Sequence, residues 1–136
     1  MISRELATAY EDADYVVFGE PEFVLKIGER SARLDALLET EHSSTAAFVT
    51  AANPRSEKKS AAENAAALAV LDQLIAAAGY PWRAGEGREP DGGWVEPSRL
   101  VMGIYRENAE ALGRLFGQNA IVFVEKGRAP ELLLLA

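Results

Sequence analysis

Hydrophobic and polar positions divide the chain into short β-prone runs and amphipathic helices. Two β-prone runs, 15–18 and 23–27, flank the turn residues 19–22, which predicts a hairpin with a four-residue turn. Leucines recur at helical spacing within 31–40 and predict a short amphipathic helix. The nearly continuous apolar run 46–52 is typical of a central strand.

The clearest helix signal begins at Ser60. Ser60 and Glu63 have the spacing of a capping box, in which each side chain bonds a backbone N–H of the first turn. An apolar stripe follows, and Gly79 is a typical residue to end the helix. Because 61–78, the most apolar region, still carries Glu63 and Asp72, we expect a buried helix and not a membrane span.

The rest of the chain predicts three more strands and one more helix. The strands are expected at 99–104, 120–124 and 132–135, and the helix at 108–116. Residues 80–97 are rich in Gly and Pro without a clear period, so we predict a long loop. Loops of this length in compact domains are usually functional or mobile.

The predicted element order is ββαβαβαββ, without an internal repeat. Hairpins at both ends and crossover helices between them indicate an α+β (mixed α/β) fold. We expect a two-layer sandwich in which three helices pack on a mixed sheet of about five to six strands. With 136 residues, the chain fits a single domain, 1–136.

Composition and charge narrow the classes of partner. The chain is 49% hydrophobic and 26% charged, as globular proteins are. Its net charge of −7 and its 14 scattered Lys and Arg residues argue against nucleic acid and against an anionic membrane surface. The small basic run 55–59 is expected to be a solvated loop before a helix. Without the apolar stretch of a signal peptide near Met1, we expect a soluble, cytoplasmic protein.

The chain lacks the residues that several common types of active site and metal site require. The chain has no cysteine, which excludes disulfides and thiolate nucleophiles. His42 is the only histidine and stands at an expected helix end, where a solvated cap is more typical than a catalytic base. The glycine-rich segment 85–93 lacks the Lys-Ser or Lys-Thr of a P-loop, and its acidic residues match no calcium loop. We expect no metal site and no cofactor.

Polar residues stand at strand ends and at a helix N-terminus, where α/β sheets gather ligands. Asn64 lies four positions before Leu68, so its amide falls on the apolar stripe, where it needs a partner or costs about 1–3 kcal/mol. Asn53-Pro54 turns the chain sharply after the run that begins at Ala46. We expect a site for a small polar molecule with these candidate ligand-binding residues: Thr50, Asn53, Ser56, Asn64, Glu96, Ser98, Gln118 and Asn119.

Glu96 is the only candidate general base of this site, provided that burial raises its pKa toward neutrality. The sequence leaves open whether any reaction is catalysed. The predicted loop 80–97 is a candidate lid over the site. The competing interpretation is that each amide or hydroxyl serves only its own turn or cap.

A non-catalytic protein-interaction or homodimerisation module is the alternative function. In that case the candidate ligand-binding residues only hold loops and strands of the chain together through internal hydrogen bonds. Four consecutive leucines, 132–135, on a terminal strand would favour a covering partner such as a second copy of the chain.

The same residues carry a family resemblance, through these segments: Tyr10–Tyr15, Thr50–Pro54 with Ser56, Ser60 with Asn64, Gly87–Gly92, Glu96–Ser98 and Gly117–Ala120. The chain resembles the bacterial family known as domain of unknown function 3293, from Tyr10 to the C-terminal leucines. The resemblance implies a bacterial cytoplasmic origin, but it assigns no activity to the chain. The family usually has an aromatic residue where this chain has Ala52. If that aromatic contacts a ligand, the site is roomier here; if it belongs to the core, neighbouring side chains fill the space.

Overall fold

A computed structural model describes residues 2–135. Within this range the chain forms four α-helices, one short 3₁₀ helix and seven strands. In chain order these are α1 (Arg4–Asp12), β1 (Asp14–Val17), β2 (Phe23–Leu25), α2 (Ala32–Thr40), β3 (Thr45–Thr50), η1 (Pro54–Ser56), α3 (Ala61–Ala78), β4 (Trp82–Arg88), β5 (Val95–Met102), α4 (Arg106–Leu115), β6 (Ala120–Glu125) and β7 (Glu131–Leu134).

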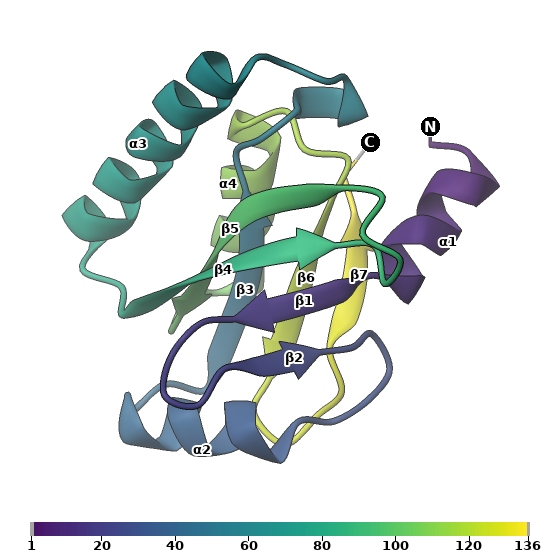
Figure 1. Cartoon of the computed structure of the whole chain (residues 1–136). Helices are drawn as coiled ribbons and strands as arrows, with labels where there is room; N and C mark the ends of the chain where they lie inside the picture. The colour runs from purple at the N-terminus through teal and green to yellow at the C-terminus, as the bar shows by residue number, and fades with distance from the viewer. Residues whose placement is uncertain (1, 136) are drawn as a thin grey trace.

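The seven strands form one antiparallel sheet in the order β2-β1-β4-β5-β3-β6-β7. The sheet is strongly curled, so β1, β2 and β4 run across the direction of β3, β6 and β7 (Figure 1). The α+β class is confirmed, but the expected mixed sheet of five to six strands and three helices is wrong. The extra strand β4 reverses the chain after α3, so β5 returns antiparallel to β3.

The predicted loop 80–97 is also wrong, because most of it forms the β4–β5 hairpin. The glycines of β4 interrupt the alternation of hydrophobic and polar residues by which a strand is predicted. One of them, Gly85, is required by close packing. A Cβ atom added to Gly85 would lie 2.2 Å from the carbonyl oxygen of Val16 on the neighbouring strand and 3.2 Å from the ring of Phe48. Here glycine allows strands and core to approach each other closely.

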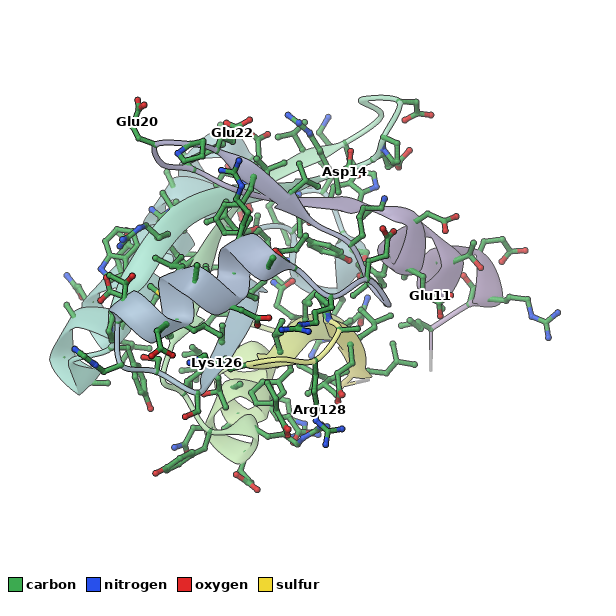
Figure 2. The ribbon with its side chains drawn as sticks, turned by 90° about the horizontal axis from the view of Figure 1, so that it is seen from below. Glu11, Asp14, Glu20, Glu22, Lys126 and Arg128 are labelled. Carbon is green, nitrogen blue, oxygen red and sulfur yellow. The ribbon has the colours of Figure 1, made fainter. Side chains whose placement is uncertain are left out.

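Helices cover both faces of the sheet, which corrects the predicted two-layer sandwich. On one face, Leu34 and Leu38 of α2 pack on a core that includes Tyr15, Phe48 and Met102. On the opposite face, α3 and α4 pack over a second core, listed here by its buried members: Ala47, Val49, Ala51, Leu71, Ile75, Val101, Ile104, Ala109, Ile121 and Phe123. Figure 2 shows α2 between the acidic β1–β2 turn (Glu20, Glu22) and the basic β6–β7 turn (Lys126, Arg128).

The helix α3 has the predicted ends but not the predicted burial. Ser60 and Glu63 form the capping box, and Gly79 ends the helix with a left-handed φ of 79°. Of its 18 residues, Leu71 and Ile75 are buried, and the helix lies along the outside of the body (Figure 1). Judged by length and composition, α3 is the one helix among residues 2–135 that meets the requirement for a membrane span, with a mean hydropathy of 1.2.

Candidate functional site

A left-handed loop connects β3 to α3 at the centre of the candidate site. Three of its non-glycine residues have positive φ: Asn53 (47°), Arg55 (57°) and Ser56 (60°). The loop is anchored by the Arg55 backbone N–H, which donates to the carbonyl of Gly117 at 2.8 Å. Left-handed backbone is unfavourable for L-residues by about 1–2 kcal/mol each. Such conformations persist where the surrounding structure imposes them, often at functional sites.

Asn53 connects three separate parts of the chain through its own polar atoms. Its backbone N–H donates to Oδ1 of Asn64 at 2.9 Å, and its Oδ1 accepts from Nδ2 of Asn64 at 2.9 Å. The same Oδ1 accepts from the backbone N–H of Lys59 at 3.0 Å. Its Nδ2 donates to Oε2 of Glu96 on β5 at 2.8 Å. Asn64 is therefore a positioning residue for Asn53, and Asn53 positions the Glu96 carboxylate.

A second group of hydrogen bonds centres on Ser56. Its Oγ lies 2.8 Å from the hydroxyl of Tyr10 on α1 and accepts from Nδ2 of Asn119 at 3.1 Å. Gln118 lies beside this group, and its Nε2 donates to the carbonyl of Ala52 at 3.1 Å. The residues just before β6 are thus joined to the β3–α3 loop and to α1.

Thr50 on β3 and Ser98 on β5 are paired across the sheet, and their side chains bond mainly to backbone. The Thr50 hydroxyl donates to the carbonyl of Pro97 at 2.7 Å, and the Ser98 hydroxyl donates to the carbonyl of Glu96 at 3.0 Å. They line a small hollow of about 40 Å³ shared with Gln118. For Thr50 and Ser98 the turn-and-cap interpretation fits these contacts.

A larger cavity of about 480 Å³ opens beside Glu96 and is named the Glu96 cavity; it is lined by Leu6, Ala9, Tyr10, Asn53, Ser56, Lys58, Glu89, Gly93, Trp94, Val95 and Glu96. Burial raises the pKa of the Glu96 carboxyl, and the hydrogen bond from Asn53 opposes part of that rise. The cavity is therefore lined by a partly desolvated carboxylate, a second carboxylate (Glu89), a lysine and two aromatic residues.

One comparison with known proteins identifies a family. The family model described as "Protein of unknown function (DUF3293)" matches residues 49–121, more than half of the chain. The chain belongs to this family. Neither the curated proteins nor the solved structures give a match to it. The matched span of this DUF3293 chain runs from the end of β3 to the start of β6 and contains the whole left-handed loop.

A second cavity, of about 570 Å³, is lined by Arg55 of this loop in the DUF3293 chain. It is named the arginine cavity and is lined by Ile2, Ser3, Leu6, Arg55, Arg114, Gly117, Gln118, Asn119 and Leu135. The candidate residues are thereby divided. Asn53, Ser56 and Glu96 line the first cavity, Gln118 and Asn119 line the second, and Asn64 lines neither.

Sequence reasoning missed Tyr10, Lys58 and Trp94 as site residues of this DUF3293 protein. The segment 80–97, the candidate lid, forms most of the β4–β5 hairpin and contributes Trp94 and Glu96 to the lining of the Glu96 cavity, and α1 borders both cavities through Leu6. α1 is capped by Ser3, whose Oγ accepts from the backbone N–H of Leu6, and none of its residues is fully buried. Leu6, Ala9 and Tyr10 of α1 are partly buried and recur at helical spacing. This amphipathic period, together with Tyr10 in the family resemblance, was the signal available.

The structure also bears on the expectations for Ala52 and His42 of the DUF3293 chain. Ala52 is buried, at 4% exposure, so this position belongs to the packed interior. His42 is exposed just after α2 with a φ of 53°, which agrees with a solvated helix end. In the part of the chain that the structure describes, no group of three or more acidic or histidine side chains is placed to hold a metal ion.

Proposed function

We propose that this chain binds a small polar molecule in the Glu96 cavity. The observation that supports it is the incomplete hydrogen bonding of the Glu96 carboxylate. Asn53 bonds Oε2, and no hydrogen bond among residues 2–135 involves Oε1, although the side chain is half-buried beside a cavity of about 480 Å³. A half-buried carboxylate oxygen gains most from a charge-assisted hydrogen bond, which a ligand hydroxyl or amine would supply.

The lining of the cavity narrows the class of ligand. Tyr10 and Trp94 provide aromatic surface, and Lys58 provides a cation opposite in sign to Glu96. Such sites bind molecules that combine an apolar or flat part with a few polar groups. In this proposal Glu96 accepts a hydrogen bond from the ligand, and it is the residue that would accept a proton in any reaction, because burial raises its pKa toward neutrality.

In this proposal α1 is the lid. Its contacts with the rest of the site are mainly hydrogen bonds: the Tyr10 hydroxyl to Ser56, and the Tyr15 hydroxyl to the Tyr10 carbonyl. The Tyr15 hydroxyl is protonated at neutral pH in any case, and burial raises its pKa further above the ordinary value. Because α1 buries no residue, its displacement costs little apolar contact and opens the Glu96 cavity to solvent.

Ligand binding is testable with the tryptophan in the cavity. The chain has two tryptophans, so Trp82→Phe leaves Trp94 as the single reporter of the Glu96 cavity. Nucleotides, amino acids and sugars are screened by thermal shift, and each positive compound is titrated against Trp94 fluorescence. We expect a compound that raises the melting temperature and changes this fluorescence, with both effects lost in Glu96→Gln.

The control for this experiment is Glu22→Gln, which removes an exposed carboxylate from the β1–β2 turn (Figure 2). It should bind each positive compound as the parent does. The proposal fails if no compound in the panel shifts the melting temperature, or if Glu96→Gln binds as well as the parent.

The alternative, a homodimerisation module, is favoured by the position of β7 at the edge of the sheet. Leu133 of β7 and Leu135, which follows the strand, already pack against the second core, while Leu134 is 52% exposed. An exposed edge strand can pair with a second copy. Light scattering of the wild-type chain and of Leu134→Glu tests this alternative, which requires a dimer that the substitution dissociates.

A further inference from the structure

The arginine cavity is lined by Arg55 of the left-handed loop and by Arg114 of α4. We propose that the arginine cavity binds the oxyanion group, phosphate or carboxylate, of a small molecule. Among residues 2–135, the charged side chains that line this cavity of about 570 Å³ are Arg55 and Arg114, and no Asp or Glu side chain lines it. Two guanidinium groups without a lining Asp or Glu side chain are unexpected in a chain with a net charge of −7. Guanidinium groups match the geometry of carboxylate and phosphate oxygens.

Both arginines are available to a ligand. Within the described chain, no ion pair and no side-chain hydrogen bond engages the Arg55 guanidinium. Arg114 has one ion pair, with Glu110 on the same helix at 3.9 Å, and its side chain is 58% exposed. An exposed i,i+4 pair contributes little to stability and is easily exchanged for a bound anion.

The backbone holds Arg55 at this place despite an unfavourable conformation. Its φ of 57° is one that Gly or Asn adopts more readily than Arg. The hydrogen bond from its N–H to the Gly117 carbonyl holds the loop against the start of the β6 segment, and a Cβ atom on Gly117 would lie 3.0 Å from Pro54. Local preference does not explain an arginine here, whereas a role for its side chain does.

Neutral donors complete the lining. Asn119 is 8% exposed, and its Nδ2 donates one hydrogen to Ser56, which leaves the second N–H of that amide for a ligand. Nε2 of Gln118 donates to two carbonyls, those of Ala52 and Phe116, so this side chain is held in place and lines the cavity without donating to a ligand. The cavity thus has two cationic donors and one neutral donor, the combination that binds an oxyanion.

The two cavities differ in charge, and the arginine cavity does not depend on the Glu96 cavity for its ligand. Both cavities are lined by Leu6 of α1. Ser56 links them, because its Oγ contacts the hydroxyl of Tyr10, which lines the Glu96 cavity, and Nδ2 of Asn119, which lines the arginine cavity. One is built around a carboxylate and the other around two guanidinium groups. Failure of one site therefore leaves the other testable.

The test uses inorganic phosphate and malonate, titrated separately by isothermal calorimetry at low ionic strength into the full chain. We expect saturable binding of at least one of them, and the two arms tell phosphate from carboxylate. Arg55→Gln and Arg114→Gln should each weaken that binding by about tenfold or more, the usual loss for a charge-assisted bond. The matched control is Arg128→Gln, on the β6–β7 turn and 78% exposed (Figure 2); it should bind as wild type.

Two further variants separate binding from folding and from the Glu96 cavity. Arg55→Gly relieves the positive φ, so it should keep or raise the melting temperature while it loses anion binding. Glu96→Gln should bind the anion as wild type does. The proposal is overturned if neither anion binds to the wild-type chain, or if Arg55→Gln binds as tightly as Arg128→Gln. A loss of anion binding in Glu96→Gln as large as in Arg55→Gln would also overturn it.

Discussion

Asn53 and Asn64 exchange two hydrogen bonds of 2.9 Å, one from the backbone N–H of Asn53 and one from the side chain of Asn64. The inward-facing amide of α3 thereby finds its partner in the left-handed loop. Since Asn53 also holds Glu96 at 2.8 Å, the pair connects the start of α3 to β5. The start of a helix, the loop that precedes it and a strand distant in sequence are thus fixed around one carboxylate.

Replacing Asn64 by Leu should destabilise the fold. The change removes both bonds and leaves the Asn53 backbone N–H without its acceptor in a partly buried position. We expect a loss of about 1–3 kcal/mol in the free energy of unfolding, measured by urea denaturation. Gln73→Leu, on the exposed side of the same helix, is the control and should change the free energy by less than about 0.5 kcal/mol. Equal effects of the two substitutions would contradict the role of the Asn pair.

Glu96 should make stability depend on pH. Because burial raises its pKa, the folded chain binds the Glu96 proton more tightly than the unfolded chain does. Wild type therefore loses stability as the pH rises from the ordinary carboxyl pKa, about 4.3, through the raised value. Glu96→Gln should be more stable than wild type at pH 7, and the difference should vanish below about pH 4. Melting temperatures of both proteins measured across this pH range test the prediction. A difference in stability between Glu96→Gln and wild type that does not vary with pH would refute it.

The Arg99–Asp72 pair should anchor α3 to the sheet. Two bonds, of 2.7 and 3.1 Å, join the guanidinium to the carboxylate, and the Arg99 side chain is 13% exposed. We expect Arg99→Gln to cost about 1.5–3 kcal/mol. A double-mutant cycle with Asp72→Asn measures the coupling. Arg128→Gln, which breaks an exposed pair, should cost less than about 1 kcal/mol.

Gly85→Ala should be among the most damaging single substitutions. The new methyl group would meet the backbone of Val16 at 2.2 Å, so β1 or β4 must shift. We expect a loss of at least about 3 kcal/mol, measured by chemical denaturation. Gly127→Ala has open space around its Cβ but a φ of 86°, so it should cost only the conformational penalty, about 1–2 kcal/mol. A smaller loss for Gly85 than for Gly127 would contradict the packing described here.

α1 should open more often than α2. Both helices have nine residues, but α2 buries Leu34 and Leu38, whereas α1 buries none. Amide hydrogen exchange should therefore be faster in α1, and Tyr10→Phe should accelerate it further, because the bond to Ser56 is lost. A compound bound in the Glu96 cavity should slow it. Equal protection of the two helices would count against α1 as a lid.

The sequence by itself determined the parts of this protein whose signals are local. The capping box of Ser60 and Glu63 and the left-handed Gly79 were legible because the residues involved are close neighbours in the chain. The inward amide of Asn64 and the turn at Asn53 followed from helical period and from proline chemistry. These residues proved to be bonded to each other and to Glu96.

Only the tertiary structure decided which polar residues face which cavity. Gly85 of β4 is required by the close approach of Val16 and Phe48, and β4 has no hydrophobic period of its own that would predict a strand. Arg55 appeared to belong to a solvated basic run, yet its anchoring to Gly117 places it beside a cavity and apart from Glu96. The physical reason is that steric contact and hydrogen bonding act between atoms close in space, whereas periodicity and capping record only neighbours along the chain.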